Sequence, residues 1–218
     1  MRMPDRRWLP PALIAGAYAF SVAVYSRLPE RVPTHWNAAG EVNGWSGRAL
    51  GAFLLPTLSL GFWLLFLALP RLDPRRANYA RFGGTYSLVV TAIILFEVTL
   101  HVLLLGAALG WPIAVDTVIT VGVGLLLLLL GNVMPRLRPN WFIGIRTPWT
   151  LSNDRAWEKT HRVGGYILSA AGLVVVVAAM LPAPWKIWVI VATAASASLG
   201  TVVYSYFAWK QETAGSVS

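Results

Sequence analysis

Six long apolar runs constrain the fold of this chain more than any other feature of its sequence. A transmembrane helix needs about 20 predominantly apolar residues to cross the hydrocarbon core of a bilayer. A spanning β-strand would instead alternate apolar and polar residues over about ten positions, which the stretch GLLLLLLG at residues 124–131 does not do. We therefore predict an all-α integral membrane protein with six transmembrane helices, at about residues 8–26, 49–69, 83–109, 113–133, 163–181 and 185–209.

The composition agrees with a membrane protein and excludes several kinds of site. Charged residues make up 12% of the chain and hydrophobic residues 56%, against about 25% and about 45–50% in soluble domains. The absence of cysteine excludes disulfides, thiolate zinc sites and cysteine nucleophiles. The basic start before the first run also suits a secretory signal, but the length of that run and the five runs after it favour an uncleaved helix.

Lysine and arginine are distributed unequally between the two ends of the predicted helices. If six helices cross the membrane, the two termini lie on one side of it. Of the 18 basic residues, 14 lie on that side, in the termini and in two connections, and 4 lie on the opposite side. Cytosolic segments of membrane proteins carry the excess of basic residues, so we predict that both termini are cytosolic. The net charge of +9 would then face anionic membrane lipid, and we expect no direct contact with nucleic acid.

Two long connections divide the chain into four predicted regions. Residues 1–70 form a two-helix region with an extracytoplasmic connection at 27–48, and residues 71–112 hold the third helix. Residues 113–210 hold the last three helices and a cytosolic connection at 134–162, and residues 211–218 are expected to form a disordered tail. Long ordered connections on a rigid scaffold tend to carry function.

The extracytoplasmic connection has the chemistry of a compact, ordered loop. Pro33 restricts the residue before it to extended backbone. Asn37, Gly40 and the pair Asn43-Gly44 are turn residues, and Asn-Gly is a strong signal for a tight turn. We expect this loop to rest on the outer ends of the helices.

His35 lies among these turn residues. A single histidine without a second histidine or carboxylate at ligand spacing makes a poor metal site, so we predict no bound metal. Two roles remain open: a hydrogen bond that fixes the loop, or recognition of something outside the cell.

The cytosolic connection is dense in aromatic and basic residues. Pro135 and Pro139 cannot continue the fourth helix, and Ser152 or Asn153 is a plausible N-cap for a following helix. On that helix Trp157 and His161 share a face, as residues four apart do. The helix could lie at the membrane interface, anchored by tryptophan and arginine.

A second interpretation of the same connection is a docking surface for a cytosolic partner, or a gate beneath the helices. Arg146 is the strongest candidate residue, because a guanidinium suits a carboxylate or a phosphate. Glu158 and Arg162 are predicted to pair, since they are four residues apart on the helix.

Two ionisable residues lie inside the third apolar run. Glu97 and His101 are four apart and share a helix face, and ionisable groups at such depth are candidates for function. They could pair as ions or through a neutral hydrogen bond, either as a proton or substrate relay or as a structural pair that fixes helix packing. Nothing resembles a catalytic triad, a paired-carboxylate site or a phosphate loop, so we predict neither enzyme activity nor a cofactor.

Two sequences in the long connections resemble known families. The cytosolic GNVMPRLRPNWFIGIRTPWTLSNDRAWEKTHRVGG resembles the signature of the SdpI family of bacterial membrane proteins. The outer PTHWNAAGEVNGW is similar to the P-x-H-x-N-x-x-G motif of a domain of unknown function that often precedes it. The inner motif falls on Gly131, Asn132, Pro135, Asn140, Gly144, Arg146, Thr147, Pro148, Trp149, Trp157, Thr160, His161 and Gly165, and the outer motif falls on Pro33, His35, Asn37 and Gly40.

The SdpI family is named for an immunity protein that protects a Bacillus cell from its own secreted killing peptide and holds a transcriptional repressor at the membrane. The resemblance implies a multipass immunity or resistance protein of the cell membrane, with a peptide toxin as a partner outside and a repressor as a partner inside. It assigns no role to Glu97 and His101. Two other functions stay open: a small transporter or proton-coupled channel that uses these two residues, and an accessory subunit of another membrane complex.

Overall fold

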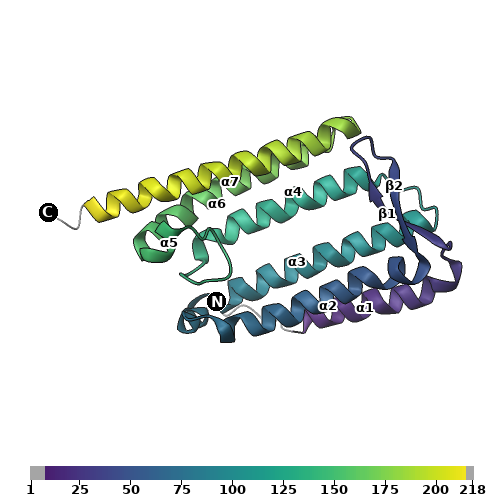
Figure 1. The fold of residues 1–218 in the computed structure, drawn as a ribbon, viewed down its shortest axis with the longest axis horizontal. Coiled ribbons are helices and arrows are strands. Elements are labelled where there is room, and N and C mark those ends of the chain that lie inside the picture. The colour runs from purple at the N-terminus through teal and green to yellow at the C-terminus, as the bar shows by residue number, and fades with distance from the viewer. Residues whose placement is uncertain (1–7, 215–218) are drawn as a thin grey trace.

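The computed structural model describes residues 8–214 as a bundle of long helices with one small β-hairpin (Figure 1). Within this range, six helices are long and apolar enough to cross a membrane, which confirms the predicted class. The elements are α1 (Leu9–Val24), β1 (Arg31–Trp36), β2 (Val42–Gly47), α2 (Arg48–Leu72), α3 (Tyr79–Ala108), α4 (Val115–Val133), α5 (Pro148–Ser152), α6 (Asp154–Ala178) and α7 (Ala183–Ala214), with short 3-10 turns η1 (Tyr25–Arg27), η2 (Arg76–Asn78) and η3 (Met134–Arg136).

The six long helices form two groups of three. Helices α1, α2 and α3 pack together as an N-terminal bundle, and α4, α6 and α7 pack together as a C-terminal bundle, with α3 and α4 in contact between them. Helix α7 ends at the same end as α5, which we call the loop end, and the strands lie at the opposite, hairpin end (Figure 1). The charge distribution predicts that the loop end is cytosolic.

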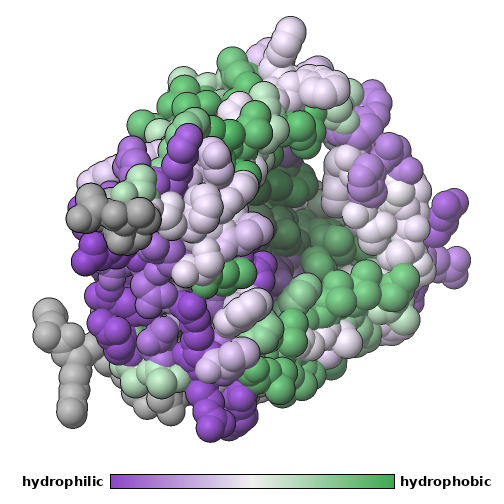
Figure 2. All heavy atoms as spheres, turned by 60° about the vertical axis from the view of Figure 1, so that its left-hand side comes forward, coloured by the Kyte–Doolittle hydropathy of each residue, from purple (hydrophilic) through white to green (hydrophobic). Residues whose placement is uncertain are grey.

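The outward faces of the helices are apolar. Large side chains such as Leu58, Phe62, Leu173 and Val203 are exposed, which in water would be a liability but suits contact with lipid. Figure 2 shows apolar side chains over both bundles, hydrophilic ones at the loop end, and a hollow lined by apolar side chains between the bundles.

Helices α4 and α6 touch backbone to backbone through four glycines. Gly124 and Gly131 are seven residues apart on α4, and Gly165 and Gly172 are seven apart on α6. A Cβ atom on Gly131 would lie 2.8 Å from the Gly165 carbonyl oxygen, and one on Gly172 would lie 2.7 Å from that of Gly124. Small residues permit this close approach of helices in a membrane.

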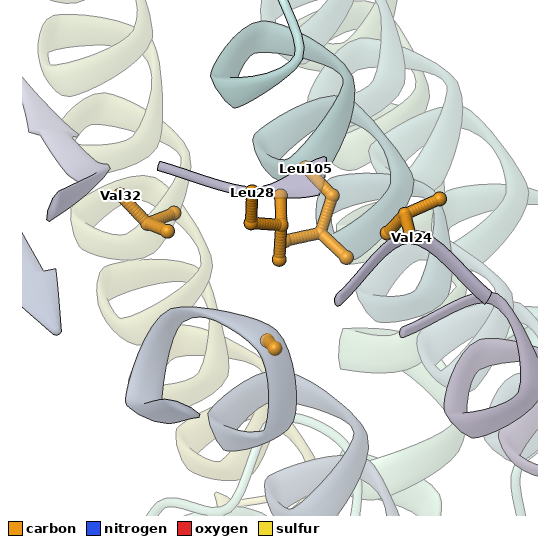
Figure 3. Packing of buried hydrophobic residues seen from close by; sticks show 5 residues of the cluster. Val24, Leu28, Val32 and Leu105 are labelled. Atoms are coloured by element: carbon orange, nitrogen blue, oxygen red, sulfur yellow. The ribbon is translucent and has the colours of Figure 1, made fainter. Parts of the chain in front are cut away.

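An apolar cluster attaches the hairpin to the N-terminal bundle. Val32 of β1 is fully buried and packs in one cluster with Val24, Leu28, Ala52 and Leu105 (Figure 3). A side chain at Gly51 would collide with Val32, because its Cβ would lie 2.6 Å from the Val32 Cβ. The first strand is thereby seated on α2.

A partly buried ion pair joins α4 and α7 of the C-terminal bundle at the hairpin end. The Lys186 ammonium donates to the Asp116 carboxylate at 2.7 Å and to the Thr117 hydroxyl at 2.6 Å. Asp116 of α4 is therefore paired with α7.

Three predictions about the elements are wrong. The pair Asn43-Gly44 lies inside β2 rather than at a turn, because the turn forms at residues 37–40. The helix of the cytosolic connection is not a separate interfacial helix, since α6 runs unbroken from Asp154 to Ala178. The start of the predicted disordered tail is helical, as α7 continues to Ala214; residues 215–218, and the basic start at residues 1–7, lie outside the described residues.

Candidate functional site

The outer motif builds the turn of the β-hairpin. The Asn37 side-chain oxygen accepts hydrogen bonds from the backbone N–H groups of Ala39 at 2.9 Å and Glu41 at 3.0 Å. Gly40 has a φ of 80°, a left-handed conformation that glycine adopts without steric cost. The turn therefore depends on these two residues of the motif.

His35 links the two strands of the hairpin. Its Nδ1–H donates to the Asn43 side-chain oxygen at 2.5 Å. Gly44 lies opposite His35 in the strand pairing, and a Cβ there would lie 2.7 Å from the His35 Cβ. This geometry explains Asn43-Gly44 better than a turn does: Asn43 binds the imidazole and Gly44 makes room for it.

The hairpin reaches from one bundle to the other. Its base is seated on α2 through Val32, whereas a Cβ on Gly40 at its tip would contact the Ala183 Cβ at 3.6 Å. Ala183 begins α7 of the C-terminal bundle. The outer motif thus lies across the hairpin ends of both bundles (Figure 1).

At the loop end, Asn140 folds the irregular segment around its own side chain. Its oxygen accepts from the backbone N–H groups of Phe142 and Ile143 at 2.9 and 2.8 Å. Its amide nitrogen donates to the carbonyls of Arg138 and Ile143 at 2.9 and 3.0 Å. Asn140 is fully buried, so its four hydrogen bonds hold the backbone of the loop from the inside.

His161 holds the same segment from the other side. The Ile145 backbone N–H donates to its Nε2 at 3.0 Å, and its Nδ1 lies 2.9 Å from the Trp157 carbonyl oxygen. Because Nε2 accepts, the proton is on Nδ1 and the fully buried ring is neutral. Gly144, with a φ of 110°, lies against this ring.

Trp157 completes the centre of the motif. Its ring stacks on His161 with 3.9 Å between centroids, and its Nε1–H donates to the Leu137 carbonyl at 3.0 Å. It is fully buried in a cluster with Tyr79, Phe82 and Leu137. Trp157 is therefore not a membrane anchor, and the predicted shared face of Trp157 and His161 is confirmed.

A threonine pair attaches the loop to α7. Thr147 caps α5 by accepting from the Thr150 backbone N–H at 3.2 Å. The Thr147 hydroxyl also donates to Ser205 of α7 at 3.0 Å. Trp149 packs on Tyr206 of the same helix, with 5.3 Å between ring centroids.

Asp73, which the sequence did not single out, joins the loop to the N-terminal bundle. It is almost fully buried in the turn between α2 and α3. Its carboxylate accepts from the backbone N–H of Arg75 at 2.7 Å, from that of Trp141 at 2.9 Å and from the Tyr79 hydroxyl at 3.0 Å. An aspartate before proline is a turn signal, but nothing local indicated a partner 68 residues away.

Two further residues between α2 and α3 also bind the C-terminal part of the chain. Arg75 donates to Asp154 at 2.8 Å and to the Leu151 carbonyl at 2.9 Å. Asn78 donates to the Pro139 carbonyl at 2.7 Å. Together with Asp73, these residues form what we call the latch between the two bundles at the loop end.

Replacing Asp73 with Asn is expected to weaken the latch. An amide has one accepting oxygen in place of two, so one buried donor loses its acceptor, at a cost of roughly 1–3 kcal/mol. Thermal unfolding in lipid nanodiscs should show a lower midpoint. Asp154→Asn is the matched control, because its carboxylate is 70% exposed and exposed ion pairs contribute little. Equal shifts for both variants would contradict the role of Asp73.

The remaining motif residues are distributed between core and surface. Arg146 is exposed and donates to the Trp141 carbonyl at 2.9 Å, and Asn132 is exposed on α4. Thr160 is fully buried, and its hydroxyl has no hydrogen-bond partner among the described residues. The predicted pairing of Glu158 with Arg162 is wrong, since Glu158 binds Arg138 at 3.0 Å.

The predicted pairing of Glu97 with His101 also does not form in the described chain. His101 lies 2.8 Å from the Ser21 hydroxyl of α1 instead, and Glu97 Oε2 is buried without a partner. Within residues 8–214 no group of three or more histidine, cysteine, aspartate or glutamate side chains is arranged to hold a metal ion.

Comparison with known proteins agrees with both motifs. Residues 136–205 match the SdpI/YfhL protein family, and residues 12–60 match a domain of unknown function, DUF1648. The chain is 25% identical over 199 residues to the protein named Immunity protein SdpI of Bacillus subtilis (strain 168), covering 91% of this chain and 93% of that one. No solved structure matches the chain significantly. The chain is therefore a multipass cell-membrane protein that is similar to the SdpI/YfhL family at residues 136–205 and to DUF1648 at residues 12–60.

Proposed function

We propose that this chain is a membrane immunity protein that protects its cell from a secreted, membrane-active peptide. The observation that carries the proposal is the similarity to an immunity protein along nearly the whole length of both chains. The role is one of binding and signalling rather than catalysis.

The hairpin is the proposed surface for the peptide. His35 and Trp45 are exposed on it, and the Arg31 guanidinium lies 5.9 Å from the centre of the Trp45 ring. Aromatic and arginine side chains contribute most of the binding energy in many interfaces. The excess of basic residues at the other end favours a hairpin that faces the outside, where a secreted peptide arrives.

Helix α7 is the proposed connection between the peptide surface and the cytosolic motif. Its first residue, Ala183, lies against Gly40 of the hairpin tip. Farther along the same helix, Ser205 binds Thr147 of the loop and Glu212 binds Lys159 of α6 at 2.6 Å. A displacement of the hairpin by bound peptide would therefore act on one helix that also holds the loop.

Replacing His35 or Arg146 with Ala is expected to abolish protection while the protein stays in the membrane. His35→Ala removes the bond that joins the two strands, and Arg146→Ala removes an exposed cation of the cytosolic motif. The assay uses Bacillus subtilis cells that lack their own immunity protein, exposed to medium from a strain that secretes the killing peptide. Survival is expected to fall to that of cells carrying an empty vector.

Glu30→Gln is the control, since Glu30 is an exposed charged residue of the same connection. It should protect like the unmodified chain. Full protection by both alanine variants, at equal amounts in the membrane, would remove the two motifs from the mechanism. Lysis of cells that express the unmodified chain would contradict the proposed function itself.

The cytosolic partner in this proposal is a transcriptional repressor held by the loop end. Arg136, Arg146 and Arg162 are exposed there, so the surface is cationic. A fluorescent fusion of the repressor encoded nearest to this chain should move to the membrane when peptide is added. It should stay dispersed in cells with Arg146→Ala, and movement in those cells would contradict the role of this surface.

A further inference from the structure

The core of the N-terminal bundle holds a cluster of four polar side chains. Ser21 comes from α1, Ser59 from α2, and Glu97 and His101 from α3. Ser21, Ser59 and His101 are at most 1% exposed. Neither motif of the long connections includes these residues, and the proposed immunity function does not use them.

The hydrogen bonds of Ser21 define the state of His101. The Ser21 hydroxyl lies 2.6 Å from the Ala52 carbonyl oxygen of α2, 3.0 Å from the Ala17 carbonyl oxygen of its own helix and 2.8 Å from His101 Nε2. A hydroxyl has one proton, and a carbonyl can only accept it, so Ser21 donates to the carbonyls and accepts from His101 Nε2–H. In the neutral ring Nδ1 then carries a lone pair that needs a donor.

Three buried atoms of this cluster have no hydrogen-bond partner in the described chain: Ser59 Oγ, Glu97 Oε2 and His101 Nδ1. Buried polar atoms are nearly always satisfied by protein or by ordered water. Two of the three are acceptors, and the only intrinsic donor is the Ser59 hydroxyl. The cluster therefore has fewer hydrogen-bond donors than acceptors. Bound water and a protonated carboxyl would supply the missing donors.

No cation of the surrounding helices compensates a charge on Glu97. The interiors of α1 and α2 contain no charged residue, and the arginines of α2 lie at its two ends, at Arg48 and Arg71. In the helices packed on α3, Tyr18 of α1 bonds Thr57 at 2.9 Å and Asp116 of α4 is paired with Lys186. The other titratable groups lie toward the two ends of the bundle: Tyr79, Arg81 and Tyr86 in the first turns of α3, and Arg31 and His35 on β1. An unpaired carboxylate at this depth would be costly.

A cavity of about 460 Å³ at the loop end stops short of the cluster, because the buried side chains of Ile14, Val90 and Ile94 pack between them. It lies among α1, α2 and α3, and its lining includes Arg71, Trp63 and Val90. Trp63 is one helical turn from Ser59 on α2, about 6 Å along the axis. The fully buried Ile94 lies between Val90 and Glu97 on α3.

The opposite side of the cluster is closed. Val24, Leu28 and Leu105 pack one turn or more beyond Ser21 and His101, toward the hairpin (Figure 3). Apolar packing therefore encloses the cluster on both sides, which favours a buried site over a continuous channel.

We propose that Glu97 is a protonated carboxylic acid that shares bound water with Ser59 and His101. The carboxyl donates to water, and the water donates to His101 Nδ1. Proton loss leaves the carboxylate beside a ring that can accept the proton on Nδ1, so the pair holds one proton in two places. This proposal is independent of the immunity function.

Infrared spectroscopy of the protein in nanodiscs tests the protonation. At neutral pH the spectrum should contain the carbonyl band of a protonated carboxylic acid, which Glu97→Gln removes and Glu30→Gln retains. Ser59→Ala should shift the band, because the hydroxyl next to the carboxyl is lost. Absence of the band in the unmodified protein, or its survival in Glu97→Gln, would overturn the proposal.

Discussion

Replacing Gly144 with Ala is expected to destabilise the protein more than any other single methyl group added to residues 137–147 at the loop end. A Cβ on Gly144 would lie against His161 Nε2, the atom that accepts from Ile145. The φ of 110° at this position is itself unfavourable for alanine, at roughly 1–3 kcal/mol. Displacing His161 would leave buried polar groups unpaired, at roughly another 1–3 kcal/mol.

The measurement is the unfolding midpoint in nanodiscs, compared with that of Gly110→Ala. Gly110 has a φ of 79°, and a Cβ there would meet no atom within 4 Å, so the control carries the backbone cost without the collision. Gly144→Ala should lower the midpoint further and also reduce protection of cells. Equal midpoints would show that the contact with His161 is unimportant.

Replacing Gly131 with Leu should separate α4 from α6. Its Cβ would lie 2.6 Å from the Ser169 backbone nitrogen and 2.8 Å from the Gly165 carbonyl oxygen. Neither backbone atom can rotate away, so the helices must move apart along the whole glycine interface. Overpacking costs typically 1–3 kcal/mol and occasionally more, and the loss of close packing at the other three glycines adds to it.

Gly61→Leu is the matched control for this change, because a Cβ on Gly61 would meet nothing within 4 Å. Both variants add the same apolar side chain to a membrane helix. The unfolding midpoint and the yield of folded protein should fall for Gly131→Leu only. An unchanged midpoint for Gly131→Leu would mean that the helices are not held by backbone contact.

The six transmembrane helices followed from the sequence because a spanning segment in lipid must satisfy its backbone internally. That demand is local, so each apolar run predicted one helix. The sequence offered Ser152 or Asn153 as the N-cap of α6, and the structure selects Asn153. This interaction is also local, since its side-chain oxygen accepts from Ala156, three residues away, at 2.9 Å. The positions of the turn residues in the outer motif were informative too, although Asn43 and Gly44 serve His35 and not a turn.

Tertiary structure decided what the polar residues do. Trp157 looked like a membrane anchor and Glu97 looked like a partner of His101, because sequence spacing reveals neighbours on one helix but not those on others. Trp157 is instead buried against α3, and His101 binds Ser21, 80 residues away. The latch at Asp73 was missed for the same reason, because its partner Trp141 lies 68 residues away in the sequence.

The sequence by itself therefore determined the class of this protein and the location of its motifs, since burial in lipid and turn geometry act over a few residues. Only the tertiary structure decided which residues form the hairpin link, the latch and the buried polar cluster. These depend on the distances between helices far apart in the chain, which are set by packing around glycines and apolar clusters.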